Sequence, residues 1–247
     1  MDAHLALLPL ADIMSAFWLS GAPGQVIAVV LFVGSIVAWS LMLSKLRELS
    51  DARTSSDRFL AAYRKESHPV SLYLRRQKYE DSPLYAIYDK GCLALGSALE
   101  SRGADPNDLF LGAVGSSKHR LSEFQMSLVR NTVERTRADQ ALLLEKSMGL
   151  LATAAIAAPF LGLLGSAWGL MEAFEALAAP GASVTLSDLA MRVAGAFLTT
   201  VVGLLVALPS AVGYGLLRDR IRRVTIAMGN YSQELVSHIE RQYLQQG

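Results

Sequence analysis

Three long stretches without a charged residue separate the apolar parts of the chain from its polar parts. They run from Ile13 to Ser44, from Ser147 to Met171 and from Val193 to Leu217, and none contains Asp, Glu, Lys or Arg. A bilayer core is about 30 Å thick, and roughly 20 apolar helical residues cross it. Since backbone polar groups in lipid are satisfied only within a helix or a closed barrel, the pattern predicts three membrane-spanning helices. The alternative is a large soluble helical core, but buried soluble helices seldom run this far without a charge.

The polar segments carry helical periodicity that extends two of the spans. A polar helix is expected from Leu46 to about Lys65, and an amphipathic helix from Leu84 to Glu100. No proline interrupts residues 107–158, which predicts one continuous helix leading into the second span. The third span is expected to continue through Ile239, with a kink but no end at Pro209, because neighbouring helices in a membrane satisfy the freed carbonyl.

These patterns predict an all-α membrane protein with three transmembrane helices, two of which extend far into the cytoplasm. The predicted segments are an outer N-terminal segment (1–23), the first span (24–44), a cytoplasmic helical region (45–146), the second span (147–173), a periplasmic turn (174–190), the third span (191–217) and a cytoplasmic C-terminal helix (218–247).

Positive charges indicate the orientation of the spans. Most of the 23 Lys and Arg residues lie in residues 45–146 and after Leu217, whereas Arg192 alone lies between the second and third uncharged stretches. Because cytoplasmic flanks are enriched in Lys and Arg, Lys45 and Arg47 after the first span predict a cytoplasmic inner end. The N-terminus and the 174–190 turn are then outside, and the C-terminus is cytoplasmic.

Composition excludes several functions. The net charge of +1 argues against a nucleic-acid-binding protein, which usually has a strongly basic face. The single Cys92 excludes an internal disulfide and a cysteine-built metal site. The four His residues show no metal-binding spacing, and phosphate-loop and nucleophile-elbow patterns are missing. No cofactor or metal is therefore expected, and an intramembrane enzyme lacks the paired acids or the nucleophile and base that it needs.

Small residues recur at four-residue spacing on the second and third spans. In lipid, such residues let helix backbones approach closely, because packing drives association there. The stripes predict a tight helical bundle within one subunit or between copies, and a protein that self-associates. The residues expected at these contacts include Gly162, Gly165, Gly169, Gly195 and Gly203, with Pro159 and Pro209 on the same spans.

Hydroxyls and carboxylates near the outer ends of these spans are the candidates for chemistry. Ser166 and Thr200 lie at similar depth on antiparallel spans, with Thr199 beside them, so that they are candidates for a proton path. The alternative is that each hydroxyl bonds a carbonyl of its own helix. Glu172 and Glu175 are weaker candidates for the pore entrance or else a solvated helix end. No acid lies deep inside a span, although a proton carrier normally needs one.

Each of the three spans carries a recognisable sequence motif. Residues 158–174 read APFLGLLGSAWGLMEAF, which strongly resembles the second-span signature of the TolQ/ExbB/MotA proton-channel family. Residues 198–210, LTTVVGLLVALPS, are similar to its third-span motif, and residues 34–40, GSIVAWS, look like the TolQ version of the first span. Topology and motif order agree over nearly the whole chain, and the TolQ branch fits better than ExbB.

The resemblance implies a homopentameric pore in the bacterial inner membrane, lined by the second and third spans of each copy. A dimer of a TolR- or ExbD-like single-span protein would occupy the pore and bring the carboxylate that this chain lacks. Proton flow would drive rotation and transmit force to the cell envelope, through a TolA- or TonB-like protein. H⁺ is the expected ion. The alternatives are an ExbB-like subunit that energises outer-membrane import and a non-conducting membrane scaffold.

The resemblance also assigns residues. Ser166 matches the second-span hydroxyl of the family, which is usually Thr, and Thr200 matches its third-span Thr. Both would face the partner's Asp and pass its proton. Gly195 departs from the pattern, because TolQ and ExbB members commonly carry Glu there. A proton path through that carboxylate is absent from this chain, and Glu172, Glu175 or Asp188 are candidates to take its place.

Overall fold

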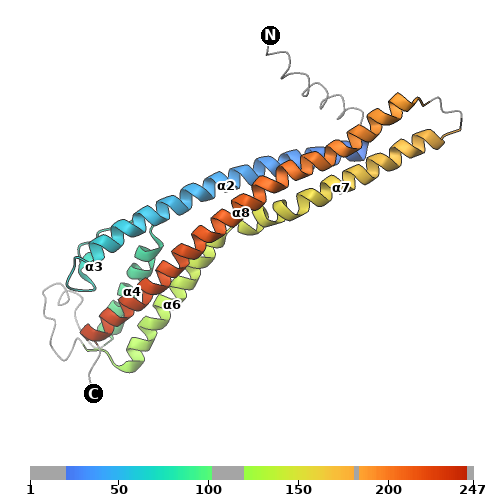
Figure 1. Cartoon of the computed structure of the whole chain (residues 1–247). Coiled ribbons are helices and arrows are strands. Elements are labelled where there is room, and N and C mark those ends of the chain that lie inside the picture. Colours follow the sequence, from blue (N-terminus) through green and yellow to red (C-terminus); the bar gives the residue numbers. More distant parts are fainter. Residues whose placement is uncertain (1–20, 102–119, 181–183, 244–247) are drawn as a thin grey trace, which may run out of the picture. The chain divides into compact units, whose positions relative to one another are not determined.

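The computed structural model describes residues 21–101, 120–180 and 184–243, which form helices and their connections without a β-strand (Figure 1). Three helical stretches, within 22–63, 123–178 and 186–243, are long and apolar enough to cross a membrane. The all-helical chain with three apolar spans is thereby confirmed over these residues. The helices are α2 (Ala22–Tyr63), α3 (Ser71–Leu74), α4 (Pro83–Glu100), α6 (Glu123–Glu145), α7 (Met148–Ala178) and α8 (Leu186–Tyr243).

The described residues belong to two compact units. Of the described residues, the first unit contains those within 21–44 and 147–217, and the second contains those within 45–146 and 218–243. Helices α2 and α8 therefore contribute to both units. Expectations for residues 1–20, 107–119, 181–183 and 244–247 lie outside the described residues, and these include most of the outer N-terminal segment and part of the 174–190 turn.

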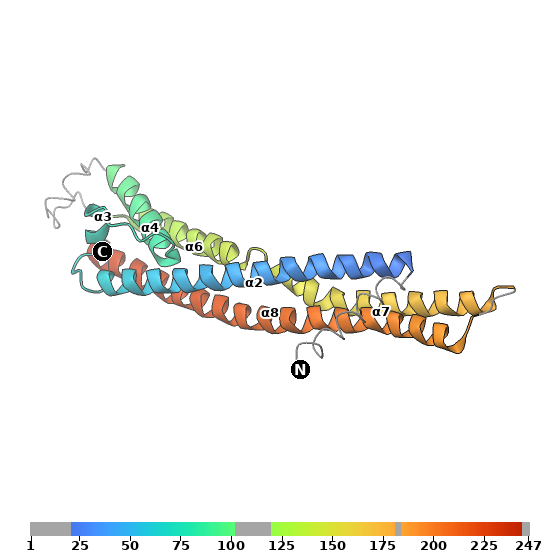
Figure 2. The same cartoon turned by 90° about the horizontal axis from the view of Figure 1, so that it is seen from above.

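In the first unit, α7 and the first half of α8 run side by side (Figures 1 and 2). Their pairing is antiparallel, because Gly169 packs on Ala196 and Gly162 packs on Gly203. Helix α2 joins through a small core made by Leu31, Ala158, Val206 and Ala207. Many other large apolar side chains of this unit are exposed, among them Phe32, Phe160 and Leu205. A surface so apolar is suited to lipid or to further protein and not to water.

The predicted continuous helix through residues 107–158 is wrong where α6 meets α7. Helix α6 ends at Glu145, Lys146 has an extended ψ of 136°, and Ser147 has a left-handed φ of 68° before α7 begins at Met148. The region contains no proline, and its one glycine, Gly149, lies inside the first turn of α7 and not at the break. Helix α8, by contrast, continues through Pro209 over 58 residues, as expected.

The second unit is held by an aromatic core around Phe59. The Phe59 ring lies 5.4 Å from those of Tyr88 and Tyr231, and all three side chains are fully or almost fully buried. Helix α4 begins where Ser82 accepts a hydrogen bond from the Tyr85 amide, a standard N-cap. The expected helices at 46–65 and 84–100 correspond to the second half of α2 and to α4.

Candidate functional site

Glycines bring α7 and α8 into backbone contact at the level of the candidate hydroxyls. A Cβ on Gly162 would lie 2.8 Å from the Thr199 carbonyl oxygen, and a Cβ on Gly165 would lie 2.7 Å from Thr199 Oγ1. Real Cβ atoms do not approach other heavy atoms so closely, so any larger residue here would force the helices apart. The short separation between backbones allows small side chains on the two helices to reach each other.

Ser166 of α7 and Thr200 of α8 are joined across this contact. Ser166 Oγ lies 2.6 Å from Thr200 Oγ1 and 3.3 Å from Thr199 Oγ1, and it donates to the Ala196 carbonyl at 2.7 Å. Ser166 and Thr199 are each only 5% exposed. The structure therefore brings all three hydroxyls of the candidate proton path into one cluster, in which Ser166 and Thr199 are buried and Thr200 is partly buried.

The hydroxyl cluster contains more hydrogen-bond acceptor oxygens than hydroxyl protons. Thr199 Oγ1 lies within hydrogen-bond distance of the Ala196 and Gly162 carbonyls, and Thr200 Oγ1 lies 3.2 Å from the Gly162 carbonyl. Each hydroxyl carries one proton and two lone pairs, so rotation about its C–O bond exchanges one partner for another. Such a cluster can pass a proton from one oxygen to the next without moving the backbone.

Other hydroxyls in the spans behave as the alternative interpretation expected. Thr153 Oγ1 donates to the Gly149 carbonyl at 2.9 Å, and Ser210 Oγ donates to the Val206 carbonyl at 2.7 Å. Both bonds lie within one helix, the common arrangement for such residues. The bonds of Ser166 that cross between α7 and α8 set it apart from Thr153 and Ser210.

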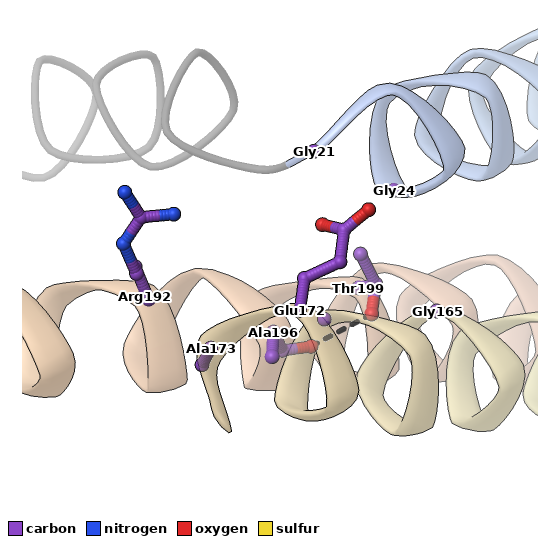
Figure 3. Close-up of a pocket in the computed structure, with 9 residues that line it drawn as sticks. Gly21, Gly24, Gly165, Glu172, Ala173, Arg192, Ala196 and Thr199 are labelled. Carbon is purple, nitrogen blue, oxygen red and sulfur yellow. Dashed lines mark hydrogen bonds between the residues drawn. The ribbon is translucent and has the colours of Figure 1, made fainter. Parts of the chain in front are cut away.

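A small cavity adjoins the hydroxyl cluster. Its volume is about 20 Å³, which is room for one water molecule. Glu172 and Arg192 provide its charged lining, and Thr199 provides its link to the cluster (Figure 3). The remaining lining residues are small: Gly21, Gly24, Gly165, Gly169, Ala173 and Ala196.

Glu172 is held in this cavity by neighbours that sequence reasoning did not identify. Trp168 Nε1 donates to Glu172 Oε1 at 3.2 Å from one turn earlier on α7. A Cβ on Gly21 would overlap the Glu172 carboxylate, so the absence of a side chain there admits the acid. The i,i+4 spacing of Trp168 and Glu172 was a usable signal, whereas the approach of Gly21 was not visible in the sequence.

The other candidate residues are placed differently. Glu175 is exposed and does not line the cavity. Gly195 is buried. The pKa of the exposed Asp188 carboxyl is lowered because the hydroxyl and the amide of Thr185 donate to it. Pro159 and Pro209 lie inside α7 and α8. Within the described ranges, no group of three or more His, Cys, Asp or Glu side chains is arranged to hold a metal ion.

Comparisons with known proteins give a consistent result. The MotA/TolQ/ExbB proton channel family matches residues 106–230. The chain is similar to the Tol-Pal system protein TolQ of Haemophilus influenzae, at 27% identity over 88% of this chain and 89% of that protein. It is 23% identical to TolQ of Pseudomonas aeruginosa over 77% of this chain and 76% of that protein. The biopolymer transport protein ExbB of Xanthomonas campestris is 26% identical to this chain over 79% of this chain and 75% of that protein.

Proposed function

Because this chain belongs to the MotA/TolQ/ExbB proton channel family, we propose that it is the proton-conducting subunit of a TolQ-like motor in the bacterial inner membrane. The motor uses the proton motive force to drive rotation and to transmit force to the cell envelope. The observation that carries this proposal is the partly buried contact of 2.6 Å between Ser166 Oγ and Thr200 Oγ1, which joins α7 to α8. This contact supports a relay along which a proton passes to or from an acid next to α7 and α8.

The conducting assembly is proposed to be a homopentamer around a central pore. The large apolar side chains exposed on the spans, such as Leu163 and Leu205, support an assembly in which further copies and lipid cover them. None of the three uncharged stretches carries a titratable acid. A TolR- or ExbD-like dimer in the pore therefore supplies the carboxylate, and a TolA- or TonB-like protein receives the force.

The orientation follows from the charges that flank the spans. Lys45 and Arg47 on α2, and Arg218 and Arg220 on α8, are placed at the cytoplasmic ends of their spans. The outer end of α7 then carries Glu172. A proton that moves inward releases about 2.3 kcal/mol for each 100 mV of membrane potential, which is enough to bias a rotational step.

ExbB remains the second candidate, because ExbB of Xanthomonas campestris is also 26% identical to this chain. The TolQ assignment is supported by the match to TolQ of Haemophilus influenzae, which covers 89% of that protein, whereas the match to ExbB of Xanthomonas campestris covers 75% of that protein. Co-purification with each type of single-span partner separates the two. A partner encoded next to a TolA-like protein favours the TolQ role, and one encoded next to a TonB-like protein favours the ExbB role.

The test of proton conduction uses the chain co-expressed with its single-span partner and reconstituted in liposomes. Under an imposed potential, the double variant Ser166→Ala with Thr200→Ala should lose at least about tenfold in H⁺ flux, the rate factor for about 1.4 kcal/mol of barrier. Thr153→Ala is the matched control, since its hydroxyl bonds only its own helix. Native mass spectrometry should find the same oligomer in all three proteins.

Wild-type flux in the double variant would contradict the hydroxyl relay. A wild-type complex that assembles and conducts no H⁺ would instead favour the non-conducting scaffold. Replacing H⁺ by Na⁺ as the imposed gradient tests the assignment of the ion in the same vesicles.

A further inference from the structure

The two glutamates near the end of α7 differ in their surroundings. Glu172 is partly buried, accepts the Trp168 indole N–H, and lines the cavity beside Thr199. Glu175 is exposed and lies outside the cavity lining. Both residues carry the same carboxylate on the same helix, so the difference comes from the packing of α7 against its neighbours.

The cavity connects the Glu172 carboxylate to the hydroxyl cluster. Glu172 lies about 9 Å along α7 from Ser166 at 1.5 Å per residue, too far for a direct hydrogen bond. Thr199 bridges the gap, because it lines the cavity and its Oγ1 lies 3.3 Å from Ser166 Oγ. One water in the cavity would have polar partners in Glu172 and Thr199, which is the kind of site that holds buried water.

Arg192 is the other charged lining residue, and no ion pair joins it to Glu172 in the described structure. In Figure 3 the Arg192 and Glu172 side chains stand apart from each other. A guanidinium stays protonated in proteins, so Arg192 does not itself carry protons. Of the residues that line the cavity, Glu172 alone carries a carboxylate, a group that can accept a proton and give it up again.

We propose that Glu172 is the proton-accepting carboxylate at the outer end of the path and that it feeds Thr199 and Ser166 through one cavity water. The inference rests on the proposed function and its orientation. The Glu172 carboxylate fits here because Gly21 has no side chain, and a Cβ on Gly21 would occupy the space of the carboxylate. The carboxylate is thus supplied by α7, whereas position 195 on α8 carries only Gly195.

Each group in the relay ends in the protonation state in which it began. The Glu172 carboxylate accepts a proton from water outside and becomes a neutral carboxyl. It then gives this proton to the cavity water, which passes one of its own to Thr199, and the hydroxyl protons shift onward through Ser166 to Thr200. Every hydroxyl gains and loses one proton, Glu172 returns to its charged form, and the proton leaves to the carboxylate of the single-span partner.

The first experiment measures H⁺ flux in vesicles that contain the complex with its partner. Glu172→Gln should reduce the flux at least about tenfold, and Glu172→Asp should reduce it less, because the shorter acid keeps its proton chemistry. Glu175→Gln is the matched control and should conduct as the wild type does. Native mass spectrometry checks that each variant assembles.

A second pair of variants tests the position of the carboxylate while Glu172 itself stays unchanged. Gly21→Ala places a methyl where the Glu172 carboxylate lies and should lower the flux, whereas Gly34→Ala on α2 meets no atom within 4 Å and should not. On the unmodified complex, dicyclohexylcarbodiimide, which reacts with protonated carboxyls in apolar surroundings, should label Glu172 and spare Glu175 in a peptide mass spectrum.

The outcomes separate the two proposals. Full flux in Glu172→Gln, with no flux in the Ser166 and Thr200 double variant, overturns the role of Glu172 and leaves the channel function standing. If Glu172→Gln fails to assemble, full flux in Gly21→Ala together with an unlabelled Glu172 overturns it. A wild-type complex without any H⁺ flux contradicts the channel function and this inference with it.

Discussion

Gly203 and Gly162 face each other at the closest approach of α7 and α8. A Cβ on Gly203 would lie 2.6 Å from the Ala158 carbonyl oxygen and 3.0 Å from Gly162 Cα. Backbone atoms cannot give way as a flexible side chain can, so this approach depends on the absence of a side chain at both positions. The same contact holds Ser166 within reach of Thr200.

Gly203→Ala should therefore destabilise the first unit by about 1–3 kcal/mol, the usual cost of overpacking. Gly203→Leu should separate the helices and abolish the oligomer. Gly215→Ala on the same helix meets no atom within 4 Å, so it should leave stability unchanged or raise it by about 0.5–1 kcal/mol. Thermal unfolding in detergent and native mass spectrometry measure both effects. An unchanged melting temperature for Gly203→Ala would contradict the close approach.

The break between α6 and α7 predicts an unusual response to glycine. Ser147 has φ of 68°, a conformation that costs a non-glycine residue roughly 1 kcal/mol. Ser147→Gly should therefore maintain or increase stability. Ser127→Gly, in the second turn of α6, should lower it by about 0.5 kcal/mol, because glycine is a poor helix former. Equal losses in chemical denaturation of the two variants would argue for a continuous helix through Ser147.

Cys92 should report the opening of the second unit. Its side chain is 3% exposed, and burial raises the pKa of the thiol well above its usual range. Iodoacetamide at pH 8 should therefore leave the folded protein unmodified, because the thiolate is the reactive form. Since Cys92 is the one cysteine of the chain, mass spectrometry needs no other assignment. Alkylation should appear in parallel with the loss of helical signal in urea, and rapid alkylation without urea would contradict the burial.

His68 should make the second unit sensitive to acid. Burial lowers the pKa of His68 below its usual 6.5, and its Nε2 has no hydrogen-bond partner among the described residues. The folded state therefore binds the proton less tightly than the unfolded state, so stability is maintained above about pH 6.5 and falls as the pH drops below it. His68→Gln should lose less stability than the wild type between pH 7.5 and 5.5 in urea unfolding. Parallel losses in the two proteins would remove His68 as the cause.

Local sequence patterns predicted most of the helices. A run of uncharged residues long enough to cross a bilayer, such as 193–217, has few structural solutions in lipid, so span number follows from composition alone. The polar continuation of α2 to Tyr63 and the start of α4 near Pro83 also follow from periodicity and capping, which act over a few neighbouring residues. The similar depth of Ser166 and Thr200 required only an antiparallel pair and a helical rise.

Contacts between distant segments decided the rest. The helix breaks at Lys146 and Ser147, although no proline lies nearby and the neighbouring Gly149 is helical. Thr153 is as polar as Ser166, although it bonds its own helix. The sequence distinguishes Glu172 from Glu175 only by the i,i+4 spacing of Trp168, and the approach of Gly21, which no local pattern predicts, gives Glu172 its partly buried cavity site. Hydropathy and periodicity depend on the identity of neighbouring residues, and they therefore determined where helices form. The direction of a hydroxyl or a carboxylate depends on which backbone, far away in the chain, comes close enough to meet it.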